Sequence, residues 1–257
     1  MAMKKDMTKE QLRAKKNNDA AVYKVMIALV LLCGALLGLR SLRNYYSTID
    51  GFSALYERTP MILIIGLVIA VLAAAAGIFI KVRGVRIVAP WVLIAGLLVA
   101  ATGWTMRLSG INDFEFLYFL CFAVLLQYII FQLYRWEFFL FSLSTVTAGG
   151  VFFSFSHGIY WTSKNILLVA ALVLVLAGTA LVTNWASHNK GYLSMGRSRI
   201  QLFPAKSAPV LIYIVNVLWL VCTIAIPLLG GLFAYYCMFA AIAVEFIAAV
   251  YYTFQLN

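Results

Sequence analysis

The sequence predicts an all-α integral membrane protein, a polytopic bundle of about eight transmembrane helices. Hydrophobic residues make up 64% of its 257 positions and charged residues 11%, against about 45–50% and about 25% in soluble domains. The apolar residues fall in runs close to the ~20 residues that a helix needs to cross a ~30 Å hydrocarbon core. We therefore predict a single transmembrane domain over residues 20–257, preceded by a basic cytoplasmic tail over residues 1–19.

The first apolar segment follows a basic stretch, as in a secretion signal, but it is longer than a signal core and ends at Arg40 without a small-residue cleavage site. We interpret it as a retained span.

The loop over residues 40–60 is expected to carry a short helix on the membrane surface. The last two segments form one run that is too long for a single span, so Pro227, Gly230 and Gly231 are predicted to break it into a hairpin. The predicted spans are 20–39, 61–80, 87–106, 114–134, 138–155, 166–185, 210–226 and 232–254.

The fifth segment is the least apolar, because hydroxyl residues and a Gly149–Gly150 pair dilute it. A re-entrant fifth segment gives an alternative with seven spans. The distribution of Lys and Arg favours eight, with both termini in the cytoplasm, because this arrangement places fifteen basic residues inside and five outside. The inner set is Lys4, Lys5, Lys9, Arg13, Lys15, Lys16, Lys24, Lys81, Arg83, Arg86, Arg135, Lys190, Arg197, Arg199 and Lys206, and the outer set is Arg40, Arg43, Arg58, Arg107 and Lys164.

Composition and motifs exclude several function classes. The net charge of +11 does not indicate nucleic-acid binding, because the basic residues flank apolar runs instead of forming a face interleaved with aromatic residues. The four cysteines lie in apolar runs without metal-ligand spacing, so neither a metal site nor a cofactor is expected. His157 and His188 are predicted on opposite sides of the membrane. No catalytic motif is found, and the chain is not expected to be an enzyme.

Small residues at four-residue spacing mark candidate helix-packing faces, because packing replaces the hydrophobic drive between helices in lipid. Gly34 and Gly38 form a GxxxG motif, and Gly66, Ala70 and Ala74 continue the pattern in the second span. Packing within the bundle is the ordinary interpretation of such a motif, and a dimerisation face is the alternative.

Glu245 is the strongest candidate for a functional residue, because it is the only ionisable side chain well inside a predicted span. A charged residue at the centre of a spanning helix costs about 2.5–3.5 kcal/mol on insertion scales, so such residues face a bundle interior or an aqueous cavity. Asn216 is about as far from the hairpin turn as Glu245, which predicts a similar depth and a possible hydrogen bond. A structural role, in which the two residues only join helices, is the alternative.

Further polar residues are predicted near the middle of their spans. Gln127, Thr145 and Thr147 are therefore added to a hypothetical substrate or proton site, together with Ser144. One hypothesis is that Gly149–Gly150 unwinds the fifth helix locally and offers backbone groups, as in broken transporter helices. The favoured interpretation of this cluster is structural, with the hydroxyl groups bonded to their own helix backbone.

These features lead to three functional hypotheses. The first is a permease or transport-associated subunit in a plasma membrane of the bacterial type, and the second is a scaffold or regulatory subunit. A lipid-processing enzyme is the third. The stretch over residues 187–209 mixes apolar and basic residues, so we expect it to lie on anionic headgroups at the cytoplasmic surface, or else to receive a membrane or ATPase partner.

Overall fold

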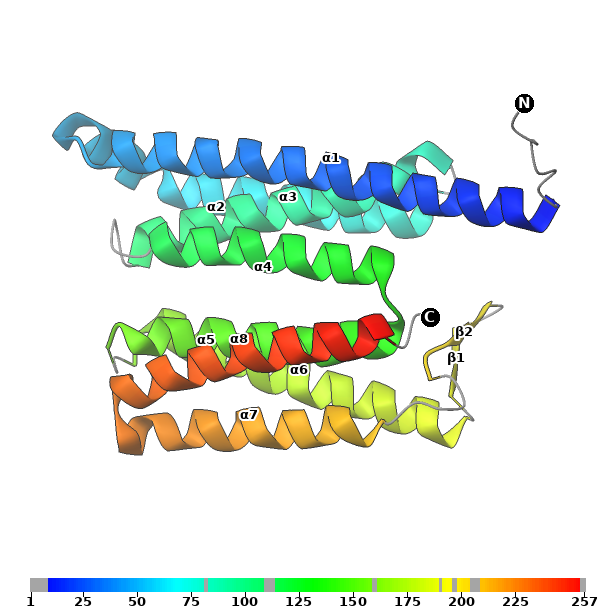
Figure 1. The fold of residues 1–257 in the computed structure, drawn as a ribbon. Coiled ribbons are helices and arrows are strands. Elements are labelled where there is room, and N and C mark those ends of the chain that lie inside the picture. Colours follow the sequence, from blue (N-terminus) through cyan, green and yellow to red (C-terminus); the bar gives the residue numbers. More distant parts are fainter. Residues whose placement is uncertain are drawn as a thin grey trace, which may run out of the picture. The chain divides into compact units, whose positions relative to one another are not determined.

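Eight α-helices make up nearly all of the described chain, and each is long and apolar enough to cross a membrane (Figure 1). The computed structural model describes residues 9–80, 83–108, 114–158, 161–189, 191–195, 198–203 and 209–254. The chain is therefore a multi-pass membrane protein. The helices are α1 (Lys9–Tyr46), α2 (Ile49–Phe79), α3 (Arg83–Leu108), α4 (Phe114–Leu133), α5 (Trp136–Ser156), α6 (Ser163–His188), α7 (Val210–Leu229) and α8 (Gly231–Phe254).

Six of these helices begin and end within four residues of the predicted spans, whereas α1 and α2 are longer. The predicted loop over residues 40–60 is wrong, because only Ser47 and Thr48 separate the two helices. Thr48 starts α2 as its N-cap, and its hydroxyl accepts a hydrogen bond from the Gly51 N–H at 3.1 Å. The expected surface helix is thus the first part of α2. The expected tail is likewise continuous with α1 from Lys9 onward.

Pro60 lies inside α2 and does not end it. A proline at this position leaves the carbonyl four residues earlier, that of Tyr56, without its usual N–H donor. The Thr59 hydroxyl donates to that carbonyl at 2.7 Å, and Thr59 is fully buried. Thr59 therefore compensates for the lost backbone bond and lets α2 continue.

Thr59→Val should lower the stability of the protein by about 1 kcal/mol, because it leaves the Tyr56 carbonyl without its side-chain donor while keeping the side-chain volume. Thermal unfolding in detergent measures the effect, and Thr59→Ser is the matched control that keeps the hydroxyl. In a Pro60→Ala background the backbone N–H returns, so Thr59→Val should then have a much smaller effect. An equal loss in both backgrounds would contradict this role.

The chain divides into two compact units. The α2–α3 unit comprises Ala35–Phe122 and Tyr160–Leu168, and the α5–α8 unit comprises Met1–Gly34, Ala123–Ile159 and Val169–Asn257. In the α2–α3 unit, a core of Tyr46, Met106, Phe114 and Leu117 joins the ends of α1, α3 and α4. The Tyr46 hydroxyl donates to the Met106 carbonyl at 3.2 Å.

Small residues hold α2 and α3 together as closely packed antiparallel neighbours (Figure 1). A methyl group on Gly66 would lie 2.4 Å from the Ala100 backbone nitrogen, and one on Gly96 would lie 2.7 Å from the Ala70 nitrogen. Four buried residues on each helix have the same spacing, so the helices pack through matching faces. These faces are Thr59, Gly66, Ala70 and Ala73 on α2, and Ala89, Gly96, Ala100 and Gly103 on α3.

The predicted packing residues thus have different outcomes. Gly66 and Ala70 lie in the α2–α3 contact, whereas Ala73 is buried at the position expected for Ala74, which is only half-buried. After Ala70 the next buried small residue of α2 is thus three positions further on, at Ala73, a spacing that also occurs in heptad seams. Gly34 and Gly38 have open space where a Cβ would lie, so their GxxxG motif makes no close backbone contact among the described residues.

The α7–α8 hairpin forms at the predicted place. Gly230 ends α7 with a φ of 94° and its N–H donates to the Ile226 carbonyl at 2.9 Å, and α8 begins at Gly231. Pro227 lies within the last turns of α7 instead of at the break. The reversal therefore depends on the positive φ of Gly230, which glycine adopts without steric cost.

A short β-hairpin between α6 and α7 was not predicted. Strands β1 (Tyr192–Met195) and β2 (Ser198–Gln201) pair antiparallel, with Met195 opposite Ser198. The Gly191 carbonyl accepts hydrogen bonds from the backbone N–H groups of Leu202 and Phe203, and both of these side chains are buried. This part of the 187–209 stretch therefore packs within the protein.

Candidate functional site

Helix α5 occupies the interior of the α5–α8 unit. Of its apolar window, 72% is buried within the protein, against 11–28% for the other seven helices. Protein side chains surround α5 instead of lipid, so its serine, threonine and glycine residues find polar or close-packed neighbours. This burial explains why the least apolar of the predicted spans is a regular helix.

Three helices meet at Glu245. The Ser142 hydroxyl of α5 donates a hydrogen bond to Oε1 of Glu245 on α8. Nε2 of Gln127, on α4, donates to the Ser142 oxygen at 2.7 Å. We call this chain of hydrogen bonds the Glu245 relay, comprising Gln127, Ser142 and Glu245. The relay brings together two predicted site residues, and it adds Ser142, which sequence reasoning had counted only as a diluting hydroxyl.

The Glu245 relay contains two acceptor atoms that lack partners. Oε2 of Glu245 and Oε1 of Gln127 are both buried and form no hydrogen bond among the described residues. Burying a polar oxygen without a hydrogen-bond donor costs free energy. Carboxylate and amide oxygens are acceptors, so this cost is relieved when a donor or a cation binds to them. The arrangement is therefore suited to hold a proton, an ammonium group or a water molecule.

The relay lies between the middle and one end of its helices. Ser142 is six residues from the start of α5, which corresponds to about 9 Å along the axis. Glu245 is nine residues from the end of the antiparallel α8, or about 14 Å. This end of both helices is the predicted cytoplasmic one.

A second buried carboxyl group lies closer still to that end. Glu137, in the first turn of α5, is 2% exposed and accepts a hydrogen bond from the Tyr252 hydroxyl at 3.2 Å. The Tyr252 ring stacks on Phe138, with a centroid distance of 4.9 Å. The predicted fifth span began one residue later and therefore left Glu137 outside it.

Asn216 belongs to a different cluster. Its Nδ2 donates to the Thr179 hydroxyl at 2.9 Å and to the Leu176 carbonyl at 3.2 Å, both on α6. Ser144 of α5 shares a hydrogen bond with Thr179 at 3.2 Å. The expected hydrogen bond between Asn216 and Glu245 is thus absent from the described structure, because Asn216 pairs with α6 and Glu245 with α5.

The two threonines of the predicted site are satisfied by their own helix. The Thr145 hydroxyl donates to the Phe141 carbonyl at 3.1 Å and accepts from Nε1 of Trp219 at 3.3 Å. The Thr147 hydroxyl donates to the Leu143 carbonyl at 2.7 Å. Neither has a recorded hydrogen bond to Glu245. The hypothetical unwinding at Gly149–Gly150 does not occur, since α5 continues unbroken to Ser156.

The surroundings of the relay limit the chemistry it can perform. Among the described residues, Glu245 forms no ion pair, and no three His, Cys, Asp or Glu side chains gather as a metal site would require. Comparisons with known proteins identify no relative of this chain. No family model, curated protein or solved structure matches it.

Proposed function

We propose that this membrane protein is a permease or a membrane subunit of a transport complex, and that the Glu245 relay binds a proton or a cationic group of the solute. The observation that carries the proposal is the buried Oε2 of Glu245, which has no hydrogen-bond donor among the described residues. A carboxyl group within a spanning helix is a functional-site hypothesis by default. The cost of placing it there is offset when a proton or cation binds.

The direction of the hydrogen bonds in the relay supports this role. Gln127 donates to Ser142 and Ser142 donates to Glu245, so the donors are directed toward the carboxyl group, which is the terminal acceptor. Three different helices contribute to it. A change in the charge of Glu245 would therefore alter contacts on α4, α5 and α8 together, which is a means of coupling binding to a helix movement.

Proton exchange at Glu245 can be tested before any solute is known. Infrared difference spectra of the protein in liposomes, taken between acidic and alkaline buffers, should contain the carbonyl band of a buried protonated carboxyl group. Glu245→Gln should remove this band, and Ser142→Ala should shift it because one hydrogen bond is lost. Glu137→Gln is the matched control, since Glu137 is also a buried carboxyl group, and it should leave the Glu245 band in place. A spectrum unchanged by Glu245→Gln would refute the proposal.

A scaffold or regulatory subunit is the second candidate, and helix α1 favours it. Only 11% of the apolar window of α1 is buried, and nothing lies within 4 Å of a Cβ built on Gly34 or Gly38. A helix from another chain can approach closely at such positions. If this function is the right one, Gly34→Leu should release a co-purifying chain, while Glu245→Gln should leave solute flux and binding unchanged.

A further inference from the structure

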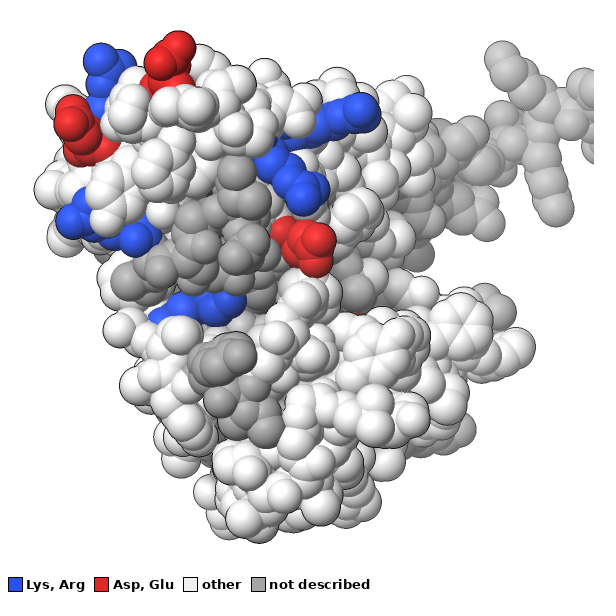
Figure 2. All heavy atoms as spheres, turned by 90° about the vertical axis from the view of Figure 1, so that its left-hand side faces the viewer, with Lys and Arg blue, Asp and Glu red and all other residues white. Residues whose placement is uncertain are grey.

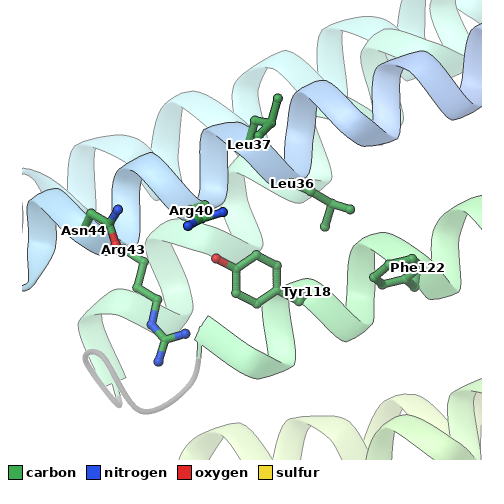
Figure 3. Close-up of a pocket in the computed structure, with 7 residues that line it drawn as sticks. All are labelled: Leu36, Leu37, Arg40, Arg43, Asn44, Tyr118 and Phe122. Carbon is green, nitrogen blue, oxygen red and sulfur yellow. The ribbon is translucent and has the colours of Figure 1, made fainter.

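A cleft between α1 and α4 combines a basic end with an apolar end. It has a volume of about 500 Å³ and lies within the α2–α3 unit (Figure 3). Arg40, Arg43 and Asn44 line it from the last two turns of α1, and Tyr118 faces them from α4. Leu36 and Phe122 lie along the continuation of the cleft, away from the end of α1.

The two arginines of the cleft differ from other basic residues of the unit. The Arg107 guanidinium lies 4.7 Å from the centre of the Tyr56 ring, and the Lys164 ammonium lies 5.6 Å from that of Phe116. Arg40 and Arg43 have no recorded aromatic or carboxylate partner among the described residues. Because they are three residues apart on a helix, their side chains share one face. Both therefore line the cleft, Arg40 beside the Tyr118 hydroxyl and Arg43 nearer the end of α1 (Figure 3).

The apolar part of the cleft begins one helical turn from the arginines. Leu36 precedes Arg40 by four residues, or about 6 Å along the axis, and Phe122 follows Tyr118 by one turn on α4. Figure 3 shows Leu36 and Phe122 facing the space between the two helices and Tyr118 directing its hydroxyl toward α1. A ligand of this cleft thus needs an anionic head and an apolar tail.

The contact between α1 and α4 also leaves space on its other side. A second cavity of about 270 Å³ is lined by Ala35, Gly38 and Leu42 of α1 and by Leu117 and Cys121 of α4. Protein interiors normally fill such space with side chains.

Figure 2 looks onto the end of the molecule where α1 stops, and both signs of charge are visible there among uncharged side chains. Arg40 and Arg43 belong to the last two turns of α1, and basic side chains at the end of a spanning helix are at the depth of lipid headgroups.

We propose that the α1–α4 cleft binds an anionic phospholipid. Arg40 and Arg43 bind its phosphate, because guanidinium groups match phosphate oxygens through paired charge-assisted hydrogen bonds. Tyr118 and Asn44 supply further polar contacts, and one acyl chain follows Leu36 and Phe122. This site is separate from the Glu245 relay, so it stands whether or not the proposed transport function is correct.

The test is native mass spectrometry of the full-length protein released from detergent, titrated with phosphatidylglycerol or with phosphatidylcholine of the same acyl chains. Wild-type protein should retain phosphatidylglycerol in preference. The double variant Arg40→Gln/Arg43→Gln should bind it about thirtyfold more weakly, given roughly fivefold per basic residue at an anionic surface. Arg58→Gln/Arg107→Gln is the matched control, because it removes the same charge from the same unit, and it should bind like wild type.

Two further measurements separate the possible outcomes. Phosphatidylglycerol should raise the unfolding temperature of the wild type but not that of Arg40→Gln/Arg43→Gln, whose unfolding temperature in phosphatidylcholine should equal that of the wild type. Arg40→Lys/Arg43→Lys should recover part of the binding. Equal loss in the control variant, equal retention of both lipids, or full competition by glycerol phosphate lacking acyl chains would each overturn the proposal.

Discussion

Gly66→Ala should destabilise the protein by about 3 kcal/mol, at the upper end of the range for overpacking a close contact. The added methyl group would lie 2.4 Å from the Ala100 backbone nitrogen and 2.8 Å from the Gly96 carbonyl oxygen. Because backbone atoms cannot turn aside as a flexible side chain can, α2 and α3 must separate. Thermal unfolding in detergent, followed by helical circular dichroism, measures the loss.

Gly178→Ala is the matched control for this prediction. Gly178 lies within α6, and nothing lies within 4 Å of a Cβ built there. Since alanine has a higher helix propensity than glycine by about 0.8–1.0 kcal/mol, this substitution should be neutral or stabilising. If Gly66→Ala and Gly178→Ala behave alike, the α2–α3 contact is not as close as the structure describes.

The spans were predictable because a single physical requirement, the thickness of the hydrocarbon core, fixes the length of each apolar run. The connection between α1 and α2 was not, because charged residues such as Asp50 and Arg58 can lie on a helix that projects from the membrane as easily as in a loop. Pro60 seemed to support a loop. Its effect is cancelled by the adjacent Thr59 hydroxyl, which sequence spacing alone did not reveal.

The packing motif shows a different limit of sequence reasoning. Gly34–Gly38 and Gly66–Ala70 have the same spacing, yet only the second pair lies in a close helix contact. The difference lies in the partner, since α3 carries Gly96, Ala100 and Gly103 in register with α2. A small-residue pattern therefore predicts a close contact only when a second helix has a matching pattern.

The candidate site was predictable in part. The cost of a carboxyl group in a span singled out Glu245, and the polar character of Gln127 was correctly noted. The link between Gln127 and Glu245 runs through Ser142, and it depends on which face of α5 turns toward α8. That orientation is set by contacts between residues that are far apart in the sequence. Asn216 and Glu245 are equally distant from the hairpin turn, but this predicts only a similar depth and not that the two side chains face each other. The orientation of α7 about its axis directs Asn216 toward α6.

Trp219→Ala should remove about 3–5 kcal/mol of stability, the usual cost of deleting a large buried ring. Trp219 is 1% exposed, and its ring lies 5.8 Å from that of Phe152 in an edge-on arrangement. The substitution therefore leaves a cavity between α5 and α7. Trp185→Ala is the matched control, because Trp185 is 52% exposed on α6 and should change stability little.

Trp219→Phe separates the ring from its hydrogen bond, and it also tests whether Thr145 belongs to the proposed site. It keeps an aromatic ring but removes part of the ring volume together with the Nε1 donor to Thr145, and the lost hydrogen bond alone costs about 1 kcal/mol. In a double-mutant cycle with Thr145→Val, the two losses should be less than additive, since each removes the same bond. Because Thr145 has no recorded hydrogen bond to the Glu245 relay, neither variant should move the Glu245 infrared band. A band that shifts with Thr145→Val but not with Trp219→Phe would place this hydroxyl in the site and not only in the α5–α7 contact.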